Sequence, residues 1–172
     1  MNYNEAKREF ISTWGSMGPY WGINRTMAQI HALLLISPEA LTTEDVMKQL
    51  EISRGNANMN LRDLVDWSLV MKKVKAGDRK DYFEAEKEPW KIAKYVARER
   101  RKRELSPLIK SLEVLSEFEG DGRDKNVKIF KKTVSGLKKM VLQTDNAIEM
   151  LMHAEESWFW SHMMGMIKFF KD

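Results

Sequence analysis

The sequence predicts a mainly α fold with one small β-hairpin wing. Apolar residues recur at three- and four-residue spacing through most of the 172 residues, which is the period of amphipathic helices. Between residues 69 and 85 this period gives way to two β-prone stretches that flank the turn Ala76-Gly77-Asp78. We therefore divide the chain into an N-terminal helix over residues 1–19, a helix-and-hairpin domain over residues 20–88, and a helical region over residues 89–172.

Two helices are predicted at the start of the chain. Residues 4–17 form the first, which Gly18-Pro19 ends, and residues 21–36 form the second, which Ser37-Pro38 ends. We expect the second to be the scaffold on which later helices pack, because it carries one apolar stripe: Ile23, Met27, Ile30 and Leu34. His31 lies in this segment, where a single histidine is more often a hydrogen-bonded structural residue than a ligand or a base.

Residues 41–85 predict a helix, a tight turn, a second helix and then the hairpin. Thr42 is the expected N-cap of the first helix, with Asp45 three residues on to complete a capping box. Ser53 is the expected N-cap of the second helix. The apolar stripe of that second helix consists of Ala57, Leu61, Leu64 and Val65. This order of elements is that of a winged helix-turn-helix, a module that places its second helix in the major groove of DNA.

The opposite face of the second helix carries residue types that suit DNA. Asparagine can read an adenine edge, arginine can bind guanine or phosphate, and a helix N-terminus attracts phosphate. Gly55, Asn56, Met59, Arg62 and Asp63 project away from the apolar stripe, with Asn58 and Asn60 on its flanks. In the alternative, Ser53 only caps the helix and the amides only face water. The predicted DNA contacts of this helix are Ser53, Arg54, Gly55, Asn56, Asn58, Met59 and Arg62.

The hairpin supports the DNA interpretation independently because its tip is basic. Lys72, Lys73, Lys75, Arg79 and Lys80 surround the turn. Lysines can also merely keep an edge hairpin soluble. Directly after a helix-turn-helix, however, we expect Lys75, Arg79 and Lys80 to contact the DNA backbone or minor groove. Residues 53–103 contain 15 Lys and Arg against 8 Asp and Glu, so their net charge is +7, whereas that of the whole chain is +4.

Composition argues against other classes of protein. The chain has no cysteine, which excludes disulfides and thiol chemistry and is compatible with a reducing cytoplasm, where we expect the protein. Its polar N-terminus is not a signal peptide, and its longest aliphatic run, residues 32–36, is far too short for a membrane span. We find no glycine-rich phosphate loop and no nucleophile–base arrangement. We therefore expect no enzyme activity, no cofactor and no metal.

The region after the hairpin begins with a basic helix. Pro89 is well placed as its first residue, and Pro107 is expected to end it near Ser106. Its basic run, residues 98–103, has two equally supported interpretations: a solvated face, or contact with phosphate or with acidic residues of a partner subunit. Residues 108–118 predict a further helix, which the segment EGDGRDKN ends.

The final helix carries a heptad seam with one polar member, Thr144. We interpret the seam as part of a homodimer interface, although it could also pack within one chain. Its predicted dimer contacts are Val127, Phe130, Val134, Leu137, Val141, Ile148 and Leu151. The aromatic C-terminal segment must be buried, either in the dimer core or around a small effector, for which Trp158 and Trp160 are the candidate residues.

Three motifs resemble the GbsR family of MarR-like transcriptional regulators. They are SRGNANMNLR, GDRKDYFEAEKEPW and ERRKRE, and the resemblance covers residues 20–105. It implies a dimeric, sequence-specific repressor, in a family often associated with osmoprotectant genes, some members of which respond to choline or a related quaternary ammonium compound. It places DNA contacts at Ser53, Arg54, Gly55, Asn56 and Arg62, and wing contacts at Arg79 and Lys80.

The predicted function is therefore that of a homodimeric transcriptional repressor that binds double-stranded DNA and responds to a choline- or betaine-like small molecule. The alternative is a winged helix that binds a partner protein without sequence-specific DNA binding. Such a protein-docking face should be more apolar and poorer in amides than the face on the second helix, and its wing need not be basic. DNA-binding assays across salt concentrations separate the two.

Overall fold

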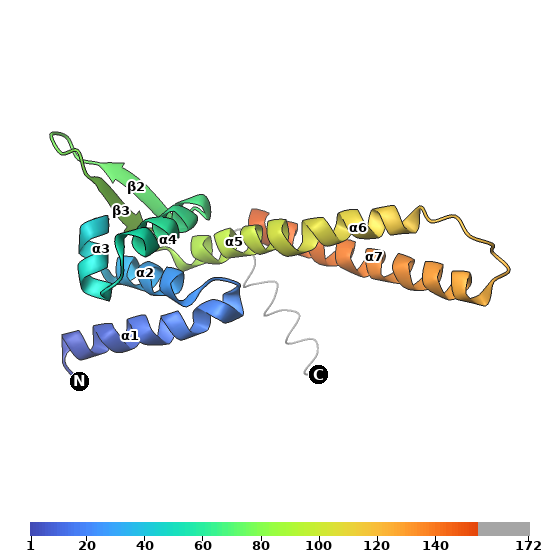
Figure 1. Cartoon of the computed structure of the whole chain (residues 1–172), viewed down its shortest axis with the longest axis horizontal. Helices are drawn as coiled ribbons and strands as arrows, with labels where there is room; N and C mark the ends of the chain where they lie inside the picture. The colour runs from blue at the N-terminus through green and yellow to red at the C-terminus, as the bar shows by residue number, and fades with distance from the viewer. Residues whose placement is uncertain (155–172) are drawn as a thin grey trace. The chain divides into compact units, whose positions relative to one another are not determined.

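The computed structural model describes residues 1–154, and the chain divides into two units after Val96. The first unit contains the elements that the sequence predicted as helix-turn-helix and hairpin (Figure 1). Its elements are α1 (Tyr3–Met17), the 3-10 turn η1 (Gly18–Trp21), α2 (Arg25–Ile36), β1 (Leu41–Thr42), α3 (Thr43–Leu50), α4 (Arg54–Asp66), β2 (Val70–Val74) and β3 (Asp81–Ala85). Helix α5 (Pro89–Arg100) begins in this unit and ends in the second.

Both predicted N-caps are confirmed. The Thr42 side chain accepts a hydrogen bond from the backbone N–H of Asp45, whose carboxylate accepts from the Thr42 N–H at 2.9 Å. The hydroxyl and N–H of Thr42 hold the pKa of Asp45 below its ordinary value. Ser53 accepts from the Asn56 N–H at 3.3 Å and so begins α4. Two satisfied caps fix where the two helices begin, and therefore which side chains stand at their N-terminal ends.

The second helix begins later than predicted. Pro19 is the second residue of the 3-10 turn η1, and Gly22, with a φ of +77°, ends it in the left-handed conformation that glycine adopts without strain. Asn24 then caps α2 by accepting from the Met27 N–H at 2.9 Å. The prediction that helix starts at residue 21 was therefore wrong, because the apolar stripe extends back into a turn of different geometry.

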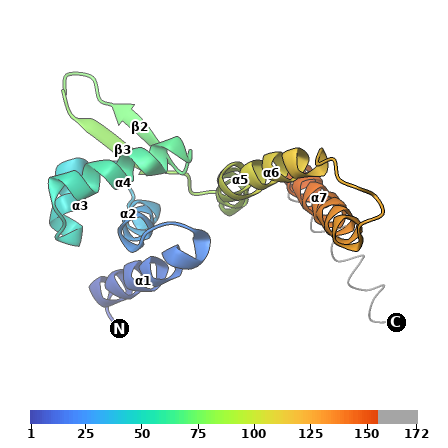
Figure 2. The same ribbon diagram turned by 45° about the vertical axis from the view of Figure 1, so that its right-hand side comes forward.

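The hairpin belongs to a three-stranded antiparallel sheet with the order β1-β3-β2. Gly77, with a φ of +82°, allows the turn in which the Asp78 N–H bonds to the Lys75 carbonyl at 3.1 Å. The two-residue strand β1, which pairs Leu41 with Phe83, was not predicted, because two residues carry no readable alternation. The hairpin extends beyond the helices of its unit (Figures 1 and 2).

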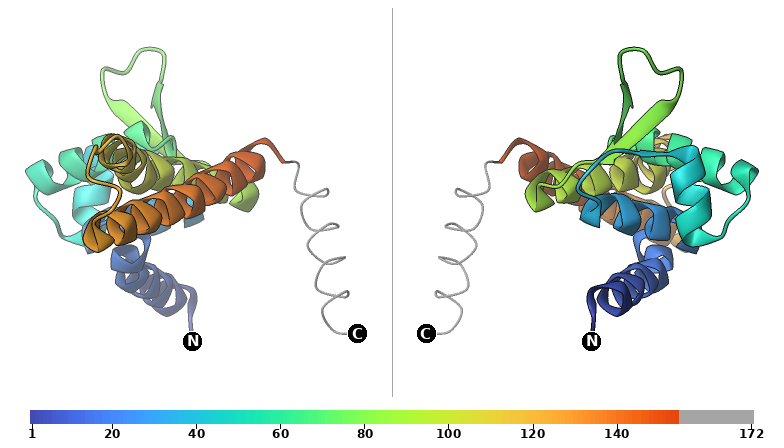
Figure 3. Two further views of the ribbon diagram at one scale, coloured as in Figure 1. Left: turned by 90° about the vertical axis from the view of Figure 1, so that its right-hand side faces the viewer. Right: turned by 90° about the vertical axis from the view of Figure 1, so that its left-hand side faces the viewer.

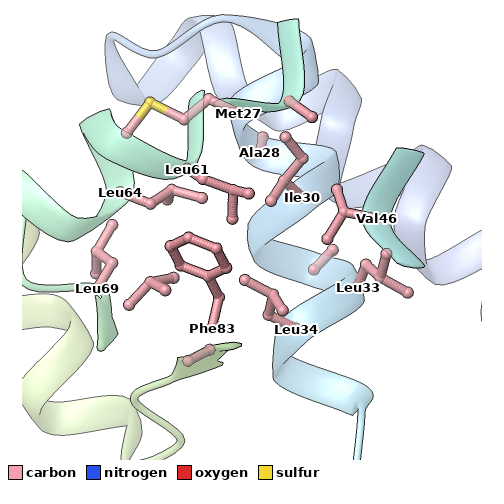
Figure 4. Packing of buried hydrophobic residues seen from close by; sticks show 14 of the residues in the cluster. Met27, Ala28, Ile30, Leu33, Leu34, Val46, Leu61, Leu64, Leu69 and Phe83 are labelled. Atoms are coloured by element: carbon pink, nitrogen blue, oxygen red, sulfur yellow. The ribbon is translucent and has the colours of Figure 1, made fainter. Parts of the chain in front are cut away.

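The core of the first unit lies between α2, α4 and the sheet (Figure 4). Phe83 of β3 points between the helices and lies near Leu34, Leu61, Leu64 and Leu69. Helix α2 is the predicted scaffold, since seven of its twelve residues are buried. The largest fully buried side chains are Trp67, Ile30, Leu33, Leu34, Leu61, Leu64, Leu69, Val46, Val70 and Asn60. Burial of these groups holds α4 and the hairpin on one support.

The second unit continues α5 into a π-helical turn (Arg101–Leu105) and α6 (Ser106–Ser116). The prediction that Pro107 ends the helix was wrong. A proline ring in an α-helix clashes with the carbonyl four residues earlier. In the wider π turn the Ser106 N–H instead bonds to the Arg101 carbonyl, five residues back, and Pro107 stands in the first turn of α6.

A chain reversal after α6 leads to the long helix α7 (Lys125–His153), which runs back along it (Figure 1; Figure 3, left). Leu112 of α6 and two members of the predicted seam, Val134 and Val141, form the small core of this hairpin. Arg101 holds the hairpin at its base, where its guanidinium bonds to both carboxylate oxygens of Asp145 at 2.5 and 2.9 Å. No helix within residues 1–154 has the length and apolarity that crossing a bilayer requires.

His31 is a buried structural residue, as predicted. Its side chain is 3% exposed, and its Nδ1 accepts a hydrogen bond from the indole N–H of Trp14 at 3.4 Å. Trp14 in turn stacks with Phe10 and meets Trp21 edge to face. Burial disfavours the charged imidazolium and lowers the pKa of His31 to about 4.

This pKa makes the stability of the first unit depend on pH. Well above pH 6.5, His31 is neutral in both the folded and the unfolded chain. As the pH falls through 6.5, His31 becomes protonated in the unfolded chain, whereas in the folded chain it stays neutral down to about pH 4. The free energy of unfolding should therefore fall by about 3 kcal/mol from pH 7 to pH 4 through this residue. Replacing His31 with Leu should remove that component, as measured by urea unfolding across the range. Parallel pH profiles of the two proteins would contradict the assignment.

Candidate nucleic-acid interface

Helix α4 has one buried side and one side open to solvent. Ala57, Leu61 and Leu64 are fully buried against the core. The predicted DNA contacts occupy the open side: Ser53, Arg54, Gly55, Asn58, Met59 and Arg62 are exposed, and Asn56 is half-buried. The structure thus brings all seven predicted residues of this helix onto one solvent-facing surface, which we call the α4 face.

The N-terminal end of the α4 face is open in a way that suits close approach by another backbone. A Cβ atom added to Gly55 would meet nothing within 4 Å, so the fold itself does not require glycine there. Arg54 beside it donates to Glu44 of α3 at 2.8 Å, in a solvent-exposed ion pair. An exposed pair of this kind is weak, so Arg54 can exchange Glu44 for a phosphate.

Asn58, in the middle of the face, is hydrogen-bonded to a neighbouring helix, whereas Arg62, at the far end, forms no ion pair within residues 1–154. The Asn58 amide oxygen accepts from the Thr43 hydroxyl at 3.3 Å, which ties it to α3. Arg62 is exposed and makes no ion pair within the described part of the chain. An unpaired guanidinium on an open helix face is available for a guanine edge or a phosphate.

The sequence suggested that Asn60 flanks this surface. The structure instead buries Asn60 completely. Its amide accepts from the Asn24 side chain at 2.7 Å and donates to both the carbonyl and the side-chain oxygen of Asn56, at 2.8 and 2.7 Å. The spacing could have revealed this: with Ala57, Leu61 and Leu64, position 60 completes an i, i+3, i+4, i+7 stripe. Asn24 carried no comparable signal, because its partner lies 36 residues away.

The five basic residues of the wing fall into two groups. At the base, Lys72 pairs with Asp81 at 2.8 Å and Lys73 pairs with Glu84 across the hairpin. Nearer the turn, Lys75, Arg79 and Lys80 are exposed, and none forms an ion pair within residues 1–154. Those three are the wing residues that the sequence predicted to contact DNA.

Asp78 lies among the tip cations, but none of the ion pairs within residues 1–154 joins it to Lys75, Arg79 or Lys80. One of its carboxylate oxygens accepts from the Tyr82 hydroxyl at 2.7 Å and the other from the Lys80 backbone N–H at 3.0 Å. These bonds, chiefly the one from Tyr82, lower the pKa of Asp78. The ammonium group of Lys75 lies over the aromatic ring of Tyr82, 4.2 Å from the centre of that ring. Asp78 therefore shapes the turn and stays ionised, and the three tip cations together with this one carboxylate leave a net positive charge.

Most of the basic run after the wing is exposed to solvent, as one interpretation of its sequence predicted, but several of its cations also form ion pairs within the chain. Arg101 binds Asp145 and Glu149 of α7, and Arg100 pairs with Glu104 one turn later. These partners belong to the same chain and the same unit. Much of the charge in residues 98–103 thus stabilises the second unit itself, so this run is a weaker candidate for phosphate contact than the wing tip.

The predicted dimer contacts on α7 separate by exposure. Val134 and Val141 are buried between α6 and α7. Phe130 and Leu137 remain 39% and 44% exposed. The remaining seam members are half-buried: Val127, Ile148 and Leu151. The candidate effector residues, Trp158 and Trp160, lie outside the described residues.

The fold is similar to that of a solved transcriptional regulator. A crystal structure described as a transcriptional regulator aligns with a TM-score of 0.56 at 19% identity, over 84% of this chain and 98% of the other. Weaker alignments, with TM-scores of 0.41 and 0.34, are to a MepR mutant of S. aureus bound to an oligodeoxyribonucleotide and to the MarR repressor of Listeria monocytogenes. These two share 15% and 17% identity with it, cover 78% and 79% of this chain, and are covered over 94% and 88% of their own.

No family model matches the sequence, and no curated protein matches it. At this identity the first structural likeness establishes the fold alone. The predicted fold class, mainly α with a small antiparallel sheet in the winged-helix arrangement, is confirmed.

Gly55 offers a direct test of whether the α4 face is shaped by folding or by a ligand. Because the added methyl group would meet no atom, Gly55→Ala should leave the free energy of unfolding unchanged or raise it by up to about 1 kcal/mol through helix propensity. Chemical denaturation of both proteins measures this. A clear loss of stability would mean that the fold, and not an external partner, requires glycine here.

Proposed function

We propose that this protein is a sequence-specific transcriptional regulator that binds double-stranded DNA through α4 and the wing. The observation that carries the proposal is the α4 face, where an open Gly55, an amide and an unpaired Arg62 lie together on a helix that the core holds rigidly. The three exposed cations of the wing tip, which form no ion pair within residues 1–154, supply the charge that phosphate binding needs. The resemblance to GbsR-like regulators in residues 20–105 points the same way.

Each surface has its own task in this mechanism. Side chains of α4 enter the major groove and contact base edges, so they determine which sequence is bound. Lys75, Arg79 and Lys80 contact phosphates, so they contribute affinity for any sequence. The alternative, a winged helix that docks on a protein, is less well supported because the face is polar and the wing tip is basic.

We infer that the active form is a homodimer. The hairpin of the second unit leaves many large apolar side chains exposed: Leu108, Val114, Leu115, Phe118, Ile129, Phe130, Leu137 and Met140. An apolar surface of this extent marks an interaction site in a water-soluble fold. A two-fold dimer would bind two half-sites one helical turn, or a multiple of it, apart.

Repression and a response to a choline- or betaine-like effector are supported by the GbsR resemblance. Thermal-shift measurements with choline and betaine test the effector independently of DNA. Indifference to both compounds would remove this part of the proposal without affecting DNA binding.

The central test is binding to the DNA upstream of the protein's own gene and its neighbours, measured by fluorescence anisotropy against a random duplex. Arg62→Ala should cost about 1–3 kcal/mol on the preferred site and relax base preference. Gly55→Ala should also weaken binding, because its methyl group stands where DNA must approach. Absence of any sequence preference in the unaltered protein would favour the protein-docking alternative.

The wing makes a prediction about salt. Replacing Arg79 and Lys80 together with Ala should weaken binding to all sequences alike and lower the slope of log affinity against log salt by about 0.9 for each lost phosphate contact. Replacing Lys72 and Lys73 with Ala is the matched control, because their charges are compensated within the hairpin. Equal slopes for the two double variants would contradict the assignment of the tip to phosphate.

The dimer proposal is tested on the exposed part of the seam. Leu137→Asp places a charge on the apolar surface without entering the hairpin core, so it should produce a folded monomer that binds DNA poorly. Gln143→Asp is the control, since this exposed residue lies on the side of α7 opposite the buried Val134 and Val141. Sedimentation at micromolar concentration measures both. A dimer that survives Leu137→Asp unchanged, or an unaltered protein that is monomeric, would count against this interface.

A further inference from the structure

The three asparagines at the base of α4 form a continuous hydrogen-bonded relay from α2 to the α4 face. The Asn24 amide nitrogen donates to the Asn60 oxygen at 2.7 Å. The Asn60 nitrogen donates its two hydrogens to Asn56, one to the backbone carbonyl at 2.8 Å and one to the side-chain oxygen at 2.7 Å. The middle member is fully buried, and the last is half-exposed on the α4 face.

The direction of this relay is determined by two backbone groups. At one end, the Asn24 oxygen must accept, because it caps α2 by binding the Met27 N–H at 2.9 Å; its nitrogen is therefore the group that faces Asn60. At the other end, the Asn56 carbonyl can only accept, so the Asn60 nitrogen must be the group that faces it. With both ends fixed, each amide in the relay has a single orientation that satisfies all its partners.

The orientation leaves a specific polar group available on Asn56. Its side-chain oxygen is engaged by Asn60, and its amide nitrogen makes no hydrogen bond within the part of the chain that the structure describes. Two N–H donors therefore remain free on the α4 face. An asparagine that reads adenine must offer its oxygen to the base as well as its nitrogen. Held as it is, Asn56 suits a base edge that presents acceptors only.

We propose that Asn60 is a positioning residue that sets the base preference of Asn56, and that it directs Asn56 towards acceptor edges, above all the N7 and O6 of guanine, in place of the adenine edge that asparagine usually selects. This inference rests on the proposed DNA-binding function and deepens it. It differs from the expectation, drawn from residue type alone, that the amides of this helix read adenine.

The position of Asn60 argues that it does more than fill space. An apolar residue at a fully buried position of the stripe would pack without any need for hydrogen-bond partners. Here the chain buries an amide and satisfies both its donors and its acceptor with other asparagines. Such a fully satisfied buried network restricts its members to one arrangement. The arrangement that results is the one that turns the Asn56 oxygen inward.

The experiment selects binding sites from a randomised duplex pool with the unaltered full-length protein and with Asn60→Leu and Asn56→Asp. The unaltered protein should prefer guanine at one base pair of each half-site. Asn60→Leu keeps the volume of the buried side chain but frees the Asn56 amide, so discrimination at that pair should fall by about tenfold while the salt slope stays the same. Asn56→Asp keeps the hydrogen bond from Asn60 but presents a second oxygen to the DNA. The preferred base at that position should therefore change from guanine to cytosine, whose amino group donates to this oxygen.

Each outcome has a separate meaning. An adenine preference that Asn60→Leu leaves unchanged would overturn the inference while the DNA-binding function stands. A uniform loss of affinity in Asn60→Leu, with base preference intact, would also overturn it, since that is the effect of a merely structural residue. If Asn60→Leu does not fold, Asn56→Asp still decides the matter, because its network remains paired. A protein that selects no sequence at all would instead refute the proposed function.

Discussion

The packing of α4 on α2 is the constraint on which the candidate interface depends. Leu61 and Leu64 bury one side of α4, and Phe83 of β3 enters the same core, so helix and wing share one support. A helix placed by apolar burial alone can still rotate or slide by a fraction of a turn. The hydrogen bond from Asn24, the N-cap of α2, to Asn60 of α4 adds one directional bond across this contact, and that bond restricts the rotation of α4.

The number of basic residues in a segment does not by itself show where this chain is positively charged, because many of these residues form ion pairs with carboxylates. The wing base and residues 98–103 are as basic as the wing tip, yet several of their cations meet carboxylates of the same chain, as Lys72 meets Asp81 and Arg101 meets Asp145. At the tip the neighbouring carboxylate, Asp78, is occupied by Tyr82 and by backbone. The positive field that a polyanion would meet is therefore concentrated at the hairpin turn.

The second unit shows how one heptad pattern can serve two partners. Val134 and Val141 recur every seven residues and pack against Leu112 of α6, whereas Phe130 and Leu137 lie on the flank of the same seam and stay exposed. A pattern of apolar positions specifies which side of a helix is buried but not by which chain. Here the hairpin takes part of the seam and leaves the rest for the proposed second copy.

The sequence by itself determined the element order, both N-caps of the helix-turn-helix, the hairpin turn at Gly77 and the residues of the α4 face, because each follows from local periodicity, capping or turn chemistry. Only the tertiary structure decided the strand β1, the passage of Pro107 through a π turn, the pairing of Arg101 with Asp145, and the hydrogen bond from Asn24 to Asn60. In the strand, the ion pair and the hydrogen bond, residues far apart in the chain meet; in the π turn, the backbone adopts a geometry that periodicity does not encode. The orientation of the Asn56 amide belongs to this second group, since the N-cap of α2 fixes it from 32 positions away.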